Sequence, residues 1–151
     1  MTSLSIEQYK VQLRQLFTAH GVTLAYLFGS QAEGKAGLLS DVDIAVLLEE
    51  QVARERWFQV QLDLTGELTS LFHRNDVDVV ILNQATAVLA YEIAVFGQVI
   101  YDAEPGVRAE FEVSALRRYT DTKPLRQLQD RHLLERVEEY RAATQPSTFR
   151  W

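Results

Sequence analysis

The chain has 151 residues, of which 47% are hydrophobic and 24% are charged, and its formal net charge is −6. A chain of this length buries roughly two-thirds of the surface that it exposes when unfolded, which is enough for one domain. No apolar run is long enough to cross a bilayer, and the N-terminus lacks the basic and apolar regions of a secretion signal. Because there is no cysteine, a disulfide framework and a cysteine-zinc site are excluded. We expect a soluble, cytoplasmic protein with no membrane partner.

The charge is distributed unevenly along the chain. Residues 1–106 hold six Lys/Arg and fourteen Asp/Glu, whereas residues 107–151 hold nine Lys/Arg and seven Asp/Glu. Nucleic-acid binding needs a basic face that displaces counterions from phosphates. The acidic first part therefore disfavours direct nucleic-acid binding, and acidic residues gathered in a cleft would instead hold cations.

The pattern of apolar residues, glycines and prolines predicts the elements in this order: a helix from a capping box at Ser5 and Gln8 to Gly21, a strand over 22–28, a helical turn and loop over 31–39, a strand over 41–48, a helix over 54–72, a strand over 77–82, a helix over 86–96 capped by Thr86, a strand over 98–101, and a helical tail over 107–143. Proline removes a backbone donor, so Pro124 is expected to split the tail. This order predicts an α/β (α+β) fold, a mixed β-sheet flanked by helices. We expect one domain over residues 1–104 and a C-terminal helical extension over 105–151.

Two aspartates stand at the start of the second predicted strand. Asp41 and Asp43 project from one face of that strand, roughly 6 to 7 Å apart at their Cα atoms. Alternating acids are common on an exposed strand face, but the apolar residues 44–48 predict a strand buried on both faces. Because burying an unpaired carboxylate costs several kcal/mol, we expect the two to coordinate a cation.

A second acidic pair leads into the third predicted strand. Asp76 and Asp78 share a face, and either could add a third carboxylate if this strand pairs with the one that carries Asp41 and Asp43. We expect Asp78 to do so because it lies inside the strand, and Asp76 to be solvated.

Gly29 and Ser30 close the first predicted strand. A glycine lets the backbone approach a ligand, and a serine hydroxyl with the following amides suits a phosphate. Most Gly-Ser pairs are ordinary turns, so this signal depends on the carboxylates beside it.

Together these residues carry a family resemblance. The segment GSQAEGKAGLLSDVDIAVLL, followed by DVDVVILNQATAVLAYEIAVFGQVIYD, resembles the polymerase-β-type nucleotidyltransferases. Within them it is similar to the minimal nucleotidyltransferase (MNT) family, the antitoxins of HEPN–MNT toxin–antitoxin pairs, over residues 22–102. The resemblance implies these catalytic and metal-binding residues: Asp41, Asp43 and Asp78. It implies these nucleotide-binding residues: Gly29, Ser30, Lys35 and Ser40.

Two departures from the family pattern bear on the site. Many relatives have an arginine before the loop glycine, where this chain has Glu33 before Gly34, so Lys35 is the only basic residue of the loop that could meet a triphosphate. Many also have a second acid in the third strand, where Ile81 stands here. Ile81 should face away from Asp78, so this loss should spare the metal site.

The resemblance implies an antitoxin that transfers AMP from ATP to a tyrosine near the ribonuclease site of a HEPN toxin. A tyrosine hydroxyl, with a pKa of about 10, is barely ionised at neutral pH. The implied mechanism therefore activates this hydroxyl with one Mg²⁺ ion, and a second Mg²⁺ ion binds the triphosphate. The expected cofactor is Mg²⁺, the substrate is ATP, and the partner is a HEPN toxin in a hetero-oligomer.

Two other function classes stay open. A small-molecule nucleotidyltransferase of the aminoglycoside-modifying kind usually needs extra structure around its acceptor, whereas the residues after 106 are helical here, which favours a protein acceptor. An inactive module that neutralises its partner by binding alone is disfavoured by the intact carboxylates, although Glu33 keeps it open. The histidines at 20, 73 and 132 lack a zinc spacing, and we expect them at surface or helix-end positions.

The helical tail is expected to be the main partner-docking element. Its apolar stripe must be buried on something. The alternative is that it folds back onto its own domain. A local charge of +2 beside an acidic body, and the terminal Phe149-Arg150-Trp151, favour a partner. The stripe consists of Leu133, Leu134, Val137 and Tyr140.

Overall fold

The computed structural model describes residues 5–29 and 41–144, so the turn and loop expected over 31–39 and the terminal Phe149-Arg150-Trp151 lie outside the described residues. Its elements, in chain order, are the 3₁₀ turn Ile6–Tyr9, α1 (Lys10–Ala19), β1 (Val22–Phe28), β2 (Val42–Leu48), the 3₁₀ turn Arg54–Arg56, α2 (Trp57–Phe72), β3 (Val77–Ile81), the 3₁₀ turn Leu82–Gln84, α3 (Ala87–Phe96), β4 (Gln98–Asp102) and α4 (Pro105–Thr144). The predicted fold class is confirmed, and so is the predicted order of the helices and strands among the described residues.

The four strands form one mixed sheet in the order β3-β2-β1-β4. β1 is antiparallel to both β2 and β4, whereas β2 and β3 are parallel. The parallel pair brings the starts of β2 and β3 to one edge of the sheet, where Asp43 lies opposite Asp78. Because β1 runs the other way, its last residue, Phe28, also lies opposite Asp43. The topology therefore gathers three chain segments at a single edge.

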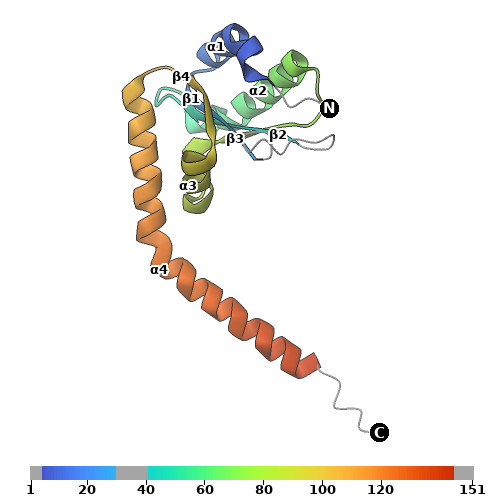
Figure 1. The fold of residues 1–151 in the computed structure, drawn as a ribbon, viewed down its shortest axis with the longest axis vertical. Helices are drawn as coiled ribbons and strands as arrows, with labels where there is room; N and C mark the ends of the chain where they lie inside the picture. Colours follow the sequence, from blue (N-terminus) through green and yellow to red (C-terminus); the bar gives the residue numbers. More distant parts are fainter. Residues whose placement is uncertain (1–4, 30–40, 145–151) are drawn as a thin grey trace.

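Helices cover both faces of the sheet (Figure 1). α1 and α2 lie on one face and build the larger core, and α3 with the first half of α4 lies on the other. Alternation along the strands places the side chains of Asp43 and Asp78 on the second face, together with Ala45 and Val80. The fully buried side chains of the first face include Leu13, Phe17, Leu64 and Leu68.

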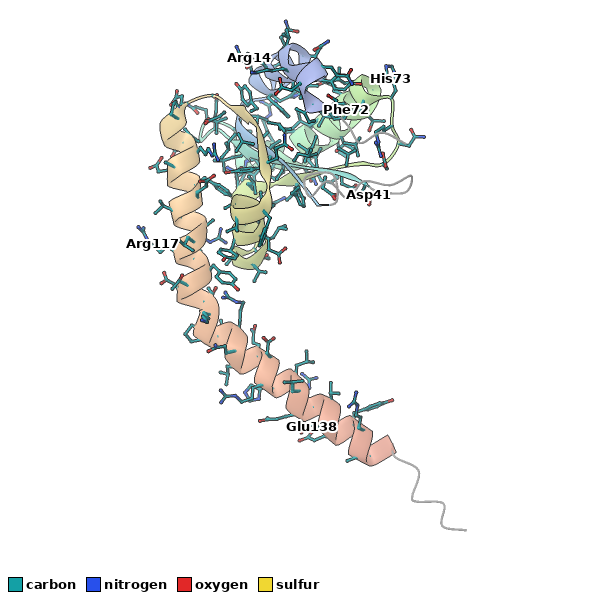
Figure 2. All side chains as sticks on the ribbon, in the orientation of Figure 1. Arg14, Asp41, Phe72, His73, Arg117 and Glu138 are labelled. Atoms are coloured by element: carbon teal, nitrogen blue, oxygen red, sulfur yellow. The ribbon has the colours of Figure 1, made fainter. Side chains whose placement is uncertain are left out.

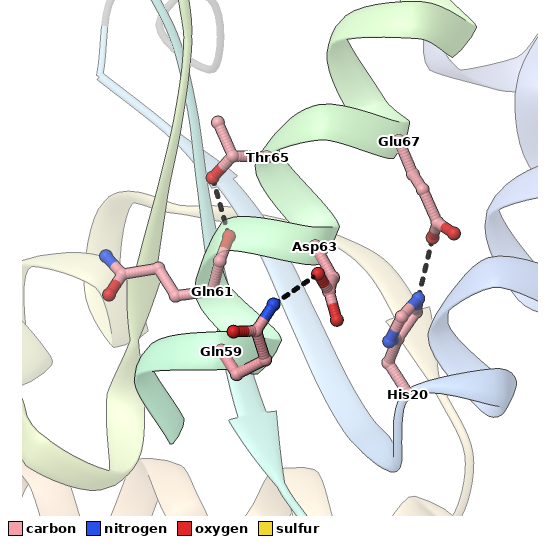
Figure 3. Close-up of polar contacts among 6 residues, drawn as sticks. All are labelled: His20, Gln59, Gln61, Asp63, Thr65 and Glu67. Carbon is pink, nitrogen blue, oxygen red and sulfur yellow. Dashed lines mark hydrogen bonds and ion pairs between the residues drawn. The ribbon is translucent and has the colours of Figure 1, made fainter. Parts of the chain in front are cut away.

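Polar contacts connect α2 to its neighbours (Figure 3). The Nε2 atom of His20, at the end of α1, lies 2.6 Å from the Oε2 atom of Glu67 in α2. The Gln61 side chain donates to the backbone carbonyl of Val79 in β3 at 2.7 Å. The first contact joins α2 to α1, and the second holds α2 against β3, the strand that carries Asp78. Two further contacts lie within α2: Gln59 with Asp63, and the Thr65 hydroxyl with the Gln61 carbonyl.

One predicted helix cap is correct and one is wrong. The Thr86 hydroxyl accepts a hydrogen bond from the Leu89 N–H at 3.2 Å and so caps α3. Ser5 makes no capping hydrogen bond, and the predicted capping box with Gln8 is absent. The chain enters here as a 3₁₀ turn, which places the first amides differently from an α-helix, and α1 begins only at Lys10.

The first half of α4 is attached to the body by aromatic and polar contacts. Phe111 packs against Tyr26 of β1 with ring centroids 5.8 Å apart. The Tyr26 hydroxyl donates to Glu112 at 2.8 Å, and the Arg108 Nε donates to the same carboxylate at 2.9 Å. Burial is the main cause that raises the pKa of Tyr26. This part of the tail therefore folds back onto its own domain.

The second half of α4 leaves the body (Figure 1). Every described side chain from residue 127 to residue 143 is exposed, and we call this segment the distal arm. The predicted split at Pro124 is wrong, because α4 continues through it. The helix bends instead, and the hydroxyls of Thr120 and Thr122 donate to carbonyls one turn earlier, a pattern that bends helices. None of the described helices is long and apolar enough to cross a membrane.

Candidate active site

Asp43 lies at the centre of an acidic cluster at the starts of β2 and β3. Its side chain is half-buried. Burial first, and then the negative charges of Asp78, Asp41 and Asp76, raise the pKa of the Asp43 carboxyl. The structure therefore brings together the three aspartates that the sequence singles out, and adds Asp76 as a fourth neighbour.

Asp41 and Asp78 are the accessible members of this cluster. Asp41 directly precedes β2 and is exposed at the edge of the sheet (Figure 2). Asp78 lies within β3 and is also exposed. A ligand that arrives from solvent can therefore reach both carboxylates, and the half-buried Asp43 lies opposite Asp78 in the strand register.

The expectation that Asp76 is solvated is wrong. Arg74 Nε and Nη2 donate to its two carboxylate oxygens at 2.8 and 2.6 Å. The side chains of Arg74 and Asp76 are only 16% and 27% exposed. The hydrogen bonds from Arg74 hold the pKa of Asp76 below its usual range. The sequence signal for this pair was an arginine two residues before the acid, at the end of α2.

Gly29 lies directly against Asp43. Its φ is +75°, and a Cβ placed on it would lie 2.5 Å from Asp43 Oδ2. Only glycine fits this position without strain. The sequence predicts a close backbone approach at Gly29, and in the structure that approach is to a carboxylate of the cluster. The other expected nucleotide-binding residues, Ser30, Lys35 and Ser40, lie outside the described residues.

By donor type and charge, the cluster fits a divalent cation. Mg²⁺ binds oxygen ligands, carboxylates above all. As the side chains stand within residues 5–29 and 41–144, no three acidic or histidine side chains form a ready ligand set. Like charges repel when no cation lies between them, and this repulsion adds to burial, the larger cause, in raising the pKa of Asp43. Asp41, Asp43 and Asp78 are the residues that could hold the ion.

Residues 11–105 match the family described as polymerase beta, nucleotidyltransferase. The chain belongs to this nucleotidyltransferase family. The match covers the sheet, α2, α3 and the acidic cluster, and it ends where α4 begins. No curated protein matches the chain.

Solved structures of toxin–antitoxin complexes share the fold of this nucleotidyltransferase. A chain of a toxin–antitoxin structure with AMP-PNP is 25% identical, with a TM-score of 0.70, and the match covers 83% of this chain and 98% of that one. A chain of the complex between a tri-AMPylated HEPN toxin of Shewanella oneidensis and an MNT antitoxin is 23% identical, with a TM-score of 0.67, and the match covers 86% of this chain and 99% of that one. A chain of an MntA-HepT toxin-antitoxin structure has a TM-score of 0.66, 23% identity and coverage of 85% and 98%. The resemblance to the MNT branch is confirmed.

Proposed function

We propose that this nucleotidyltransferase is an antitoxin that transfers AMP from ATP to a tyrosine of a HEPN toxin. The acidic cluster carries the proposal, because it combines two accessible carboxylates with a half-buried one on the nucleotidyltransferase sheet. The similar structures with AMP-PNP and with an AMPylated HEPN toxin support ATP as the substrate and a toxin as the acceptor.

The transfer forms one bond and breaks one. The tyrosine oxygen bonds to the α-phosphorus of ATP, the bond from that phosphorus to the bridging oxygen breaks, and pyrophosphate leaves with the electron pair. Asp78, exposed at the start of β3, accepts the tyrosine proton on a carboxylate oxygen. Asp41, Asp43 and Asp78 would hold Mg²⁺, which would neutralise the triphosphate and favour ionisation of the attacking hydroxyl.

In this proposal the helical extension over residues 105–151 binds the toxin. The first half of α4 is used to attach the helix to its own domain, so docking is left to the distal arm. Its exposed leucine, valine and tyrosine side chains, on a helix that leaves the body, favour a protein surface over a small acceptor. The apolar side chains concerned are Leu133, Leu134, Val137 and Tyr140.

The test is a transfer assay with the HEPN protein encoded beside this chain. Both proteins are incubated with Mg²⁺ and ATP labelled at either the α- or the γ-phosphate, and each is weighed by mass spectrometry. We expect the α-label alone to enter the toxin, on a tyrosine, and RNA cleavage to fall in proportion. Asp43→Asn is the matched control, because it keeps the size of the side chain and removes its charge.

Two outcomes contradict the proposal. Loss of RNA cleavage without any label in the toxin, and equally with Asp43→Asn, indicates an antitoxin that acts by binding alone. Label that enters only small hydroxyl compounds, such as an aminoglycoside, indicates a small-molecule nucleotidyltransferase.

A further inference from the structure

Arg74 lies beside the acidic cluster and is held there by two hydrogen bonds. Arg74 Nε and Nη2 donate to the two carboxylate oxygens of Asp76 at 2.8 and 2.6 Å, so the two side chains form a bidentate ion pair. Hydrogen bonding to Asp76, with the charges of Asp76 and Asp41, raises the pKa of Arg74. Its positive charge is therefore close enough to act on Asp41 as well as on its direct partner.

The turn after α2 delivers Arg74 to this place. His73 ends α2 in the left-handed conformation, with φ 54° and ψ 45°, which reverses the chain direction. The Arg74 N–H then donates to the carbonyl of Thr69 at 3.2 Å. The backbone of Arg74 is thus fixed to the end of α2, while its side chain reaches the start of β3.

Asp76 is held at its backbone as well as at its side chain. Its carbonyl accepts a hydrogen bond from the Val42 N–H at 2.8 Å. That N–H belongs to the peptide between Asp41 and Val42, at the point where β2 begins. Asp76 therefore connects the segment that carries Asp41 and Asp43 to the segment that carries Asp78.

We propose that Arg74 is a positioning residue of the site: by holding Asp76 it fixes the paired starts of β2 and β3 and keeps the Asp76 carboxylate away from the cation. Asp41, Asp43 and Asp78 are then the carboxylates left to bind that cation. The inference rests on the proposed function, because it assigns Arg74 a role in that same site. A lysine in place of Arg74 would keep the positive charge but could not make the bidentate contact with Asp76.

Two consequences separate this role from that of an ordinary stabilising ion pair. Removing the Arg74 charge leaves four neighbouring carboxylates with less opposing charge, so a divalent cation should bind more tightly. At the same time the loosened strand starts should lower the rate of transfer, because catalysis depends on exact placement of the reacting groups. A merely structural pair would lower the melting temperature and leave both other properties unchanged.

The cation probe is Mn²⁺, titrated into the full chain without toxin or nucleotide and followed by electron paramagnetic resonance of the free ion. We expect Arg74→Ala to bind Mn²⁺ about three- to tenfold more tightly and Arg74→Lys to bind as the wild type does. Asp76→Asn should bind about three- to tenfold more weakly, because the cluster loses one negative charge while Arg74 keeps its positive charge. Arg14→Ala, which removes an exposed arginine of α1, is the control and should change nothing.

Transfer of AMP to the toxin is measured on the same proteins. Arg74→Ala and Arg74→Lys should both lower kcat about tenfold or more and leave the KM for ATP nearly unchanged. Unchanged or weaker Mn²⁺ binding by Arg74→Ala, or an unchanged kcat in Arg74→Lys, overturns the proposal even if melting temperatures fall. Should Arg74→Ala fail to fold, Arg74→Lys and Asp76→Asn still decide it. If the wild type transfers no AMP, the proposed function fails, and the Mn²⁺ titrations still test Arg74 by themselves.

Discussion

The start of β2 and the distal arm of α4 differ in the kind of surface that they leave uncompensated. The first region carries negative charge, and the second carries exposed apolar side chains. At the start of β2, carboxylates that repel one another lie on a sheet whose central strands, β1 and β2, are mostly buried. Along the distal arm, apolar side chains are exposed on a helix that has left the body. A cation would satisfy the first region, and an apolar protein surface would satisfy the second.

The two regions also differ in how much they affect the stability of the folded chain. The carboxylates lie in a folded domain that tolerates their repulsion, whereas the distal arm adds little burial to the fold that supports it. We therefore expect substitutions at the start of β2 to change catalysis and the stability of the metal-free protein. Substitutions in the distal arm should change partner binding and leave the stability of the free chain as it is.

The largest expected effect is that of Asp43→Asn on transfer. A metal ion contributes several kcal/mol to transition-state stabilisation, so its loss should lower kcat/KM by about a thousandfold. The measurement is the initial rate of AMP incorporation into the toxin. Transfer at the wild-type rate would contradict the catalytic role of the cluster.

The same variant has a predicted effect on stability that depends on pH. The pKa of Asp43 is raised in the folded protein, so its protonated form contributes stability at low pH that is lost as pH rises through the raised pKa. Metal-free Asp43→Asn should therefore melt above the wild type at pH 7, and the difference should disappear below the ordinary carboxyl pKa of about 4. Added Mg²⁺ should raise the melting temperature of the wild type and not that of the variant.

The second effect is that of the distal arm on toxin binding. Leu133→Ser with Val137→Ser removes side chains that are 58% and 38% exposed in the free chain. We expect toxin affinity to fall by about 2 to 3 kcal/mol, as at other apolar interface centres, with the free chain changing by less than about 0.5 kcal/mol. Calorimetry measures the affinity, and Glu138→Gln, on the same arm, is the control. Unchanged affinity would remove the distal arm from the interface.

The sequence predicted most of the acidic cluster and missed the residues that hold it. Alternation in a strand places Asp41 and Asp43 on one face, because that placement depends only on local geometry. The place of Asp78 beside them was conditional on the pairing of the two strands, and the structure shows that pairing. The Arg74–Asp76 pair depends on the turn at His73, whose left-handed conformation is uncommon for any residue other than glycine and could not be read from the sequence. A solvated Asp76 was the simplest expectation without that turn.

The course of α4 could not be predicted from the sequence for the same reason, because it depends on contacts between residues far apart in the chain. Its helical pattern was readable, but the sequence could not show that α4 would divide into an attached half and an exposed half. That division depends on long-range contacts, such as Tyr26 with Glu112 and Tyr91 with Tyr119. Pro124 predicts that the helix is split, whereas α4 contains this proline and bends along its length without ending at it.

A third prediction concerns the joint between these two halves. Tyr119 stacks on Tyr91 of α3 with centroids 3.9 Å apart and an interplanar angle of 14°, and Arg126 lies 3.8 Å over the Tyr119 ring. Tyr119→Ala should lower the free energy of unfolding by about 1 to 3 kcal/mol. Because the chain has no cysteine, spin labels can be placed at introduced cysteines in α1 and the distal arm. We expect a broader distribution of distances between them.

The control for this joint is Leu134→Ala, which removes an exposed apolar side chain from the distal arm. It should leave both the unfolding free energy and the distance distribution nearly unchanged. A Tyr119→Ala variant with the wild-type distance distribution would mean that the stacked rings do not set the direction of the arm.

The smallest predicted effect belongs to the hydroxyl that joins β1 to α4. Tyr26→Phe keeps the buried ring against Phe111 and removes only the hydrogen bond to Glu112, which retains Arg108 as a partner. The free energy of unfolding should therefore fall by about 1 kcal/mol, measured by urea denaturation, with no change in Mg²⁺-dependent transfer. Tyr9→Phe is the matched control, because the Tyr9 ring packs against Phe72 on the opposite face of the sheet. If Tyr26→Phe lowered transfer while Tyr9→Phe did not, the attachment of α4 would influence the acidic cluster, and the two regions would not be independent.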